Sequence, residues 1–120
     1  MLYYLASPYT DEDPRIMDAR YRLVLTALAL VLRSGKSAYS PIVHWHVVSL
    51  EFPDIPYEMY LINDLEHLSH CDVMLVLTST GWDKSRGIAA EIAFAKDHHI
   101  TIKYISPRTG EITDEPTTAN

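Results

Sequence analysis

Short apolar runs alternate along this chain with longer segments of helical character, and this alternation restricts the fold more than any other feature. The runs lie at residues 2–6, 37–40, 72–77 and 100–105. The run at 72–77 is almost uniformly apolar, which is typical of a strand covered on both faces of a parallel sheet. Strands that are joined through helices run parallel, with the helices packed on the two faces. We therefore predict an α/β domain built on a parallel sheet.

The segments between the strands carry helix start and stop signals. Helices are predicted at about residues 14–34, 57–69 and 86–97. Asp13 can cap the first helix, Pro14 suits its first position, and Gly35 suits the residue after its end. The segment Ile42–Pro56 contains histidines and prolines and is predicted to be a loop.

Length and composition narrow the class of protein. The chain has 120 residues, and we expect one domain over residues 1–107 with a polar tail at 108–120. A net charge of −6 argues against a nucleic-acid polymer as partner, although a single nucleotide needs only a local anion pocket. The longest apolar stretch, Leu23–Leu32, is about half the length that spans a bilayer, so no membrane partner is expected. The single cysteine, Cys71, excludes an intramolecular disulfide and fits a cytoplasmic location.

A candidate ligand site follows from the predicted topology. Parallel sheets bind ligands outside the carboxyl ends of their strands, and this places Ser7–Tyr9, Ser40–His46 and Thr78–Ser85 around one crevice. The third predicted helix begins at this crevice. Free backbone N–H groups near Ser85 and Gly87 favour an anion such as a phosphate.

Two carboxylates are candidates for chemistry. Glu91 lies about one turn into the third predicted helix, before the apolar stretch Ile92–Ala95, and a carboxylate entering a buried run is more often functional than a solvated one. The segment also fits a structural interpretation, in which Ser85 only caps the helix and Glu91 is a surface acid. Asp64 borders the apolar side of the second predicted helix, and alone it also fits a solvated acid. Two carboxylates that lie close together would instead suit glycosidic cleavage. In this reaction one group stabilises the cation that develops at the sugar carbon, and the other transfers the proton of the leaving group.

The segment His44-Trp45-His46 is unusual in composition. Two histidines separated by one residue can bind a metal, but no third ligand stands at a suitable spacing, so we expect neither a metal nor another cofactor. Stacking of His44 or Trp45 on a base, or simple packing, fits the segment better. Tyr9 differs from the other tyrosines because it follows the first predicted strand, where a ligand would lie.

Together these segments resemble the nucleoside 2-deoxyribosyltransferase superfamily, and in particular a small branch of bacterial and phage proteins. The matching pieces, in the order of the family, are Tyr4-Leu5-Ala6-Ser7-Pro8-Tyr9, Ser40–His44, Asn63–Leu65, Cys71–Leu77, Gly81-Trp82 and Ser85-x-Gly87-x3-Glu91-Ile92-x2-Ala95. The resemblance implies a flavodoxin-like three-layer sandwich, with a parallel sheet of four to five strands and helices on both faces. It also implies a homo-oligomer whose neighbouring subunits complete the pocket, and the apolar stretch Leu23–Leu32 is compatible with assembly.

The resemblance also implies roles for individual residues. Glu91 matches the family's nucleophile, which forms a covalent glycosyl-enzyme, and Asp64 matches an aspartate that contacts the base or its proton. The substrate-binding residues expected from the matched segments are Ser7, Tyr9, His44, Trp82, Ser85 and Gly87.

The residue at position 85 narrows the expected class of substrate. Nucleoside transferases of the superfamily carry an aspartate at this position, whereas its nucleotide hydrolases carry a serine and bind a 5′-phosphate. A serine at a helix N-terminus suits a phosphate, and an acid would repel it. We therefore expect cleavage or transfer at the N-glycosidic bond of a nucleoside 5′-monophosphate. A non-catalytic nucleotide-binding module, and an interaction protein that assembles through its first helix, are the alternatives.

Overall fold

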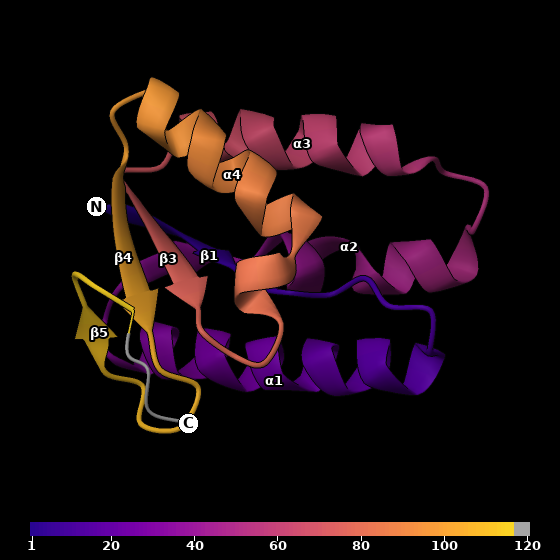
Figure 1. The fold of residues 1–120 in the computed structure, drawn as a ribbon, viewed down its shortest axis with the longest axis horizontal. Helices are drawn as coiled ribbons and strands as arrows, with labels where there is room; N and C mark the ends of the chain where they lie inside the picture. The colour runs from indigo at the N-terminus through magenta and orange to yellow at the C-terminus, as the bar shows by residue number, and fades with distance from the viewer. Residues whose placement is uncertain (117–120) are drawn as a thin grey trace.

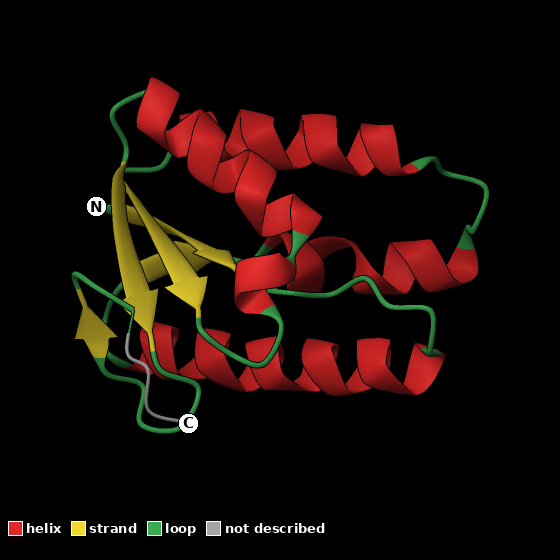
Figure 2. Ribbon diagram, viewed as in Figure 1, coloured by secondary structure: helices red, strands yellow, loops and turns green. Residues whose placement is uncertain are grey.

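The computed structural model describes residues 1–116 and contains a five-stranded sheet with helices on both faces (Figure 2). The strands are β1 (Leu2–Ala6), β2 (Ser37–Tyr39), β3 (Val73–Leu77), β4 (Thr101–Ile105) and β5 (Ile112–Thr113). The helices are α1 (Pro14–Arg33), α2 (Pro41–Glu51), α3 (Tyr57–Ser69) and α4 (Arg86–Asp97), and a turn of 3-10 helix, η1 (Trp82–Lys84), precedes α4. The strand order is β2-β1-β3-β4-β5, in which β1 to β4 are parallel and β5 is antiparallel to β4. The predicted flavodoxin-like three-layer fold is confirmed.

Alternating side chains of the central strands pack into a separate hydrophobic core on each face of the sheet. On one face, Leu5 and Leu75 pack with buried residues of α1 and α2. On the other face, Tyr4 and Met74 pack with buried residues of α3 and α4. Figure 1 shows α1 on one side of the sheet and α3 and α4 on the opposite side. Because β3 is buried along its whole length, its uniformly apolar sequence is satisfied on both faces.

Helix α1 begins and ends where its sequence signals place it. The Asp13 carboxylate accepts a hydrogen bond from the Arg15 N–H at 2.9 Å, and Gly35 has a φ of 89°, a left-handed conformation that glycine adopts without steric cost. From its middle to its C-terminal end, α1 leaves four leucines between 39% and 48% exposed, namely Leu23, Leu25, Leu30 and Leu32. Within residues 1–116, no helix has the combination of length and apolar character that crossing a membrane requires.

The prediction of a loop over Ile42–Pro56 is wrong, because Pro41–Glu51 forms α2. Ser40 caps this helix by accepting a hydrogen bond from the Val43 N–H at 3.1 Å, and a proline occupies the first helical position. The interior of α2 is rich in β-branched and aromatic residues, whose helix propensity is modest. Packing against α1 and β1 stabilises a helix that local propensity alone does not indicate.

The expected polar tail at 108–120 also needs correction in the part that the structure describes. The chain reverses direction through Gly110, which has a φ of 74°, and returns along β4 as the short strand β5. An ion pair at 2.9 Å joins Lys103 of β4 to Asp114, the residue that follows β5. This segment therefore extends the sheet by one antiparallel strand. Residues 117–120 lie outside the described residues.

Candidate active site

Two carboxylates from neighbouring helices come together on the α3–α4 side of the sheet. Glu91 of α4 is 6% exposed and Asp64 of α3 is 8% exposed, so both side chains are buried. The negative charge of Asp64 contributes to a raised pKa of Glu91, which places the two acids within range of mutual electrostatic interaction. The structure thus brings together the two acids that the sequence singles out.

The side chain of Glu91 is held by a tyrosine from the central part of the sheet. The Tyr4 hydroxyl of β1 donates a hydrogen bond to Glu91 Oε2, and Tyr4 is fully buried. Burial raises the pKa of Glu91 to about 8, the Tyr4 hydrogen bond opposes this rise, and the charge of Asp64 adds to it. Burial, and then the charge of Glu91, also raise the pKa of Tyr4. The Tyr4 hydroxyl is therefore a permanent hydrogen-bond donor to this carboxyl group.

Asp64 accepts hydrogen bonds at both of its oxygens. The Asn63 amide nitrogen donates to Oδ1 at 3.3 Å, and the Trp45 indole N–H donates to Oδ2 at 3.4 Å. Burial raises the pKa of Asp64 to about 6, and the two hydrogen bonds work in the opposite direction because they favour the ionised form. Sequence reasoning did not identify Trp45 as a partner of Asp64, because it placed Trp45 in a loop.

Tyr57, at the start of α3, is a third residue of the cluster that sequence reasoning missed. Burial raises the pKa of Tyr57, the charges of Glu91 and Asp64 raise it further, and the Arg86 guanidinium lowers it. A Cβ atom built onto Gly87 would lie 3.8 Å from the Tyr57 hydroxyl. Tyr57 therefore lies close to the first turn of α4 and within electrostatic range of both acids.

The start of α4 has the features expected of an anion site. Ser85 is its N-cap and accepts a hydrogen bond from the Ile88 N–H at 3.2 Å. The N–H groups of Arg86 and Gly87 have no acceptor within the helix, and Gly87 adds no side chain between Ser85 and Tyr57. Ser7, which follows β1 at the same edge of the sheet, is 7% exposed, and its hydroxyl has no hydrogen-bond partner among the described residues.

Tyr9 lies in a packed aromatic cluster between α1 and α2. Its hydroxyl is 2.8 Å from His46 Nδ1, and its ring meets that of Trp45 edge-on at a centroid distance of 5.1 Å. The His46 ring stacks on Tyr21 of α1 at 3.8 Å. Tyr9 is 7% exposed, and its ring packs against Trp45, the residue that donates to Asp64.

His44 and Trp82 lie in other surroundings. His44 is exposed beside the rings of Tyr39 and His67, at centroid distances of 5.5 and 5.9 Å. His44 and the buried His46 thus have different neighbours, and no group of three or more metal-ligating side chains occurs within residues 1–116. Trp82 of η1 packs edge-on against Tyr104 of β4 at 5.8 Å.

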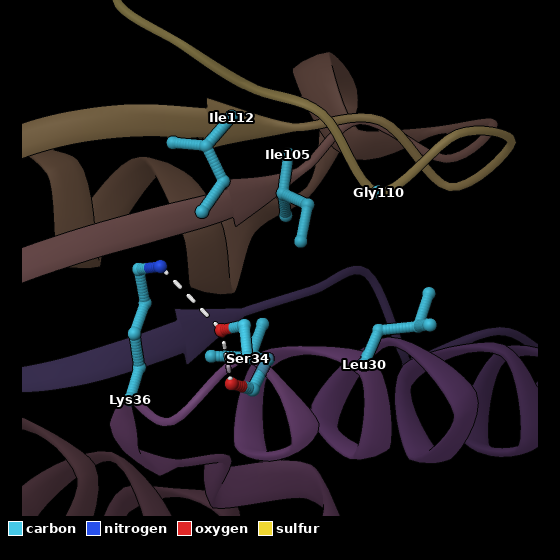
Figure 3. A pocket seen from close by; sticks show the side chains of 7 residues that line it. Leu30, Ser34, Lys36, Ile105, Gly110 and Ile112 are labelled. Carbon is cyan, nitrogen blue, oxygen red and sulfur yellow. Dashed lines mark hydrogen bonds between the residues drawn. The ribbon is translucent and has the colours of Figure 1, made fainter.

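Two surface hollows lie away from the acids. The first, of about 290 Å³, lies between the C-terminal end of α1 and the β4–β5 hairpin (Figure 3), and is lined by Leu30, Val31, Ser34, Lys36, Ile105, Gly110 and Ile112. The second, of about 600 Å³, lies beside the N-terminal half of α1, and is lined by Asp13, Arg15, Ile16, Ala19, Arg20, Leu23, Ser79 and Thr80. Neither hollow is lined by Glu91 or Asp64, which are enclosed by packed side chains.

Comparison with solved structures supports the fold. The chain is similar to a 2-deoxyribosyltransferase from the psychrotolerant bacterium Bacillus psychrosaccharolyticus, with a TM-score of 0.64 and 23% sequence identity. The similarity covers 92% of this chain and 75% of that chain. At this level of identity, the likeness shows the fold. None of the curated proteins matches the chain by sequence.

A family model also matches the chain. The model is described as a domain of unknown function (DUF1937), and it matches residues 2–106. This range runs from the start of β1 past the end of β4, and it includes both acids and the start of α4. The chain therefore belongs to the DUF1937 family.

Proposed function

We propose that this protein cleaves the N-glycosidic bond of a nucleoside 5′-monophosphate, with Glu91 as the nucleophile and Asp64 as the acid that handles the proton of the base. The observation that carries the proposal is the buried pair of carboxylates beside the start of α4. Likeness in fold to a 2-deoxyribosyltransferase supports the same broad chemistry. Membership of a small branch of bacterial and phage proteins within that superfamily is part of the proposal.

The reaction proceeds in two steps. Ionised Glu91 attacks the anomeric carbon, a carbon–oxygen bond forms, and the bond to the base breaks with its electron pair passing to the base nitrogen. Protonated Asp64 gives its proton to that base, which leaves. Water or a second base then attacks the same carbon, the ester to Glu91 breaks, and the proton of the incoming group passes to Asp64. Water as acceptor gives a hydrolase, and a base gives a transferase.

The distribution of one proton over the two acids determines when the pair can react. With burial raising the pKa of Glu91 to about 8 and that of Asp64 to about 6, the free protein at neutral pH holds one proton on the pair, mainly on Glu91. The reaction requires this proton on Asp64. Positive charge that develops on the sugar beside Glu91 favours the ionised form of Glu91, and therefore favours the transfer.

The 5′-phosphate is expected at the start of α4. The N–H groups of Arg86 and Gly87, which have no acceptor among residues 1–116, and the helix dipole both favour an anion there. The Ser7 hydroxyl, which has no partner among the described residues, can donate to the same phosphate. Gly87 permits close approach, because a larger residue would fill the space between Ser85 and Tyr57.

A mass-spectrometric screen of nucleotides and nucleosides for released base tests the proposal. We expect release from at least one 5′-monophosphate, a weaker reaction with the matching nucleoside, and a loss on the order of 10³-fold or more in Glu91→Gln. Asp97→Asn, an exposed acid at the end of the same helix, is the control and should keep wild-type activity. Full activity in Glu91→Gln, or a preference for the nucleoside, would contradict the proposal.

A non-catalytic nucleotide-binding module is the second candidate. The burial of both acids favours it, since a substrate has to displace packed side chains to reach Glu91. A rise in Tm with added nucleotide, without any released base, would support this candidate over the enzyme.

We further propose that the protein is a homo-oligomer, and that a neighbouring subunit covers the site. Six apolar side chains from α2, the following loop and α3 are each more than half exposed, and we call them the α2–α3 apolar set: Val47, Leu50, Phe52, Tyr57, Met59 and Ile62. They are more exposed than the leucines of α1. One member, Tyr57, interacts with both acids, so a subunit that packs on this set would lie against the site.

A further inference from the structure

The indole of Trp45 reaches Asp64 from a different helix. Its N–H donates to Oδ2 at 3.4 Å, while Asn63, the neighbour of Asp64 on α3, donates to Oδ1 at 3.3 Å. Each oxygen of the carboxylate thus accepts one hydrogen bond. The second lone pair of each oxygen remains available for the proton that passes between Asp64 and the base. Of these two donors, only Trp45 links Asp64 to another element of the fold.

Packing fixes the direction in which the indole N–H points. The ring of Trp45 lies 4.5 Å from that of Tyr60, and the ring of Tyr9 meets it edge-on at 5.1 Å. Tyr9 is itself held by its hydroxyl contact with His46 Nδ1 at 2.8 Å. Trp45 is half-buried, and turning its N–H to another acceptor would break these two ring contacts.

We propose that Trp45 is a positioning residue for Asp64: its clamped indole N–H holds one carboxylate oxygen in place and favours the ionised form. This inference rests on the proposed function of Asp64 as the proton donor to the base. A hydrogen bond donated to the carboxylate favours the release of the proton from Asp64. It also fixes the direction from which that proton reaches the base. Trp45 thereby acts through Asp64 without touching the reacting atoms.

The surroundings of Asp64 determine how the effect can be measured. The titratable groups that interact with it are Tyr4 of β1, Tyr39 of β2, Tyr57 and His67 of α3, and Glu91 of α4. The experiment therefore has to report on Asp64 itself and not on these neighbours. The hydrogen bond itself provides the separation, because the indole proton reports on the oxygen that it contacts.

The first measurement uses the free, full-length protein and needs no substrate. The chain has two tryptophans, Trp45 and Trp82, so its proton–nitrogen NMR spectrum has two indole signals. We expect the Trp45 signal to shift as pH passes through about 6 and the Trp82 signal to stay constant. In Asp64→Asn, the Trp45 signal should no longer titrate. A Trp45 signal that does not titrate in the wild type, or one that still titrates in Asp64→Asn, would overturn the inference.

The second measurement follows the pH dependence of turnover. Trp45→Phe keeps a ring between Tyr9 and Tyr60 but removes the N–H. We expect the pH limb that belongs to Asp64 to move to higher pH, with kcat near neutral pH changing several-fold and KM changing less than about twofold. Tyr60→Phe removes a hydroxyl that has no partner among the described residues and keeps the ring against Trp45, so it should leave that limb in place.

The two measurements separate the inference from the function on which it rests. If the wild type releases no base from any nucleotide, the proposed function fails, while the indole titration still decides whether Trp45 holds Asp64. If the wild type is active and Trp45→Phe has the wild-type pH profile, the function stands and the positioning role is wrong.

Discussion

At the scale of single residues, Glu91 links the stability of the fold to pH. Burial is the main cause that raises its pKa from 4.5 to about 8 in the folded protein. Between these two values the folded state retains a proton that the unfolded state has released. The contribution of Glu91 to the free energy of unfolding is therefore fully present below about pH 4.5, and it is lost as pH rises through about 8.

Replacing Glu91 with glutamine should remove most of this dependence. Glutamine is neutral and can still accept the hydrogen bond of Tyr4. From about pH 5 to pH 9, we expect the wild type to lose a free energy of unfolding on the order of a few kcal/mol, and Glu91→Gln to lose clearly less. Urea denaturation across this range measures the difference, with the variant more stable than the wild type at the alkaline end. Parallel curves for the two proteins would show that Glu91 is already ionised in the fold.

The sequence points to the two buried acids more directly than to the residues that donate hydrogen bonds to them. Glu91 and Asp64 stand out because a carboxylate beside apolar residues is unusual. Tyr4 does not, since a tyrosine inside an apolar strand fits a core residue equally well, and only the packing of α4 on β1 places its hydroxyl at Glu91. The contact of Tyr9 with His46 likewise depends on packing and could not be read from the sequence, and the expected role of Tyr9 at the ligand stays a prediction.

At the scale of elements, the cap of α4 determines which anion can bind. Ser85→Asp keeps a good N-cap, so the stability of the helix should change little. The added negative charge lies where the phosphate is expected, so KM for a 5′-monophosphate should rise on the order of tenfold or more relative to the matching nucleoside. Steady-state kinetics on both substrates measure this ratio. Ser85→Thr, which keeps a neutral hydroxyl cap, should preserve the wild-type preference, and an unchanged ratio in Ser85→Asp would place the phosphate elsewhere.

Local signals predicted some elements well and missed others for a physical reason. Helix α1 is bounded by Asp13 and Gly35, and α4 by Ser85, so their ends could be read from the residues alone. Helix α2 has start signals in Ser40 and Pro41, but the residues inside α2 have weak helix propensity, and the strand β5 is too short to show a pattern. Both elements form because tertiary contacts with α1, β1 and β4 outweigh weak local signals.

At the scale of the whole molecule, the sheet brings together residues that are far apart in the sequence. Tyr4, Trp45, Asp64 and Glu91 come from four different elements, β1, α2, α3 and α4. Trp45 reaches Asp64 from α2, which packs on the α1 side, while Tyr4 and the two acids lie on the α3–α4 face. Figure 1 shows how α3 and α4 lie together over this face, with the α2–α3 connection projecting beyond the sheet. The α2–α3 apolar set therefore lies beside the helices that carry the acids, and covering it would also restrict access of water to the site.

The α2–α3 apolar set is the surface on which we expect a second subunit to pack. A lysine at position 62, in Ile62→Lys, places a charge in the α2–α3 apolar set, where the native side chain is 62% exposed, so the isolated chain should fold normally. If a second subunit packs on this set, the buried charge should dissociate the oligomer, because an unpaired charge in an interface is costly. Light scattering coupled to size-exclusion chromatography measures the mass, and base release should fall together with it. Leu32→Lys on α1, where the leucine is 48% exposed, is the matched control and should leave the mass unchanged. If Leu32→Lys dissociates the assembly and Ile62→Lys does not, α1 provides the interface; a monomeric wild type at micromolar concentration would mean that one chain alone forms the whole site.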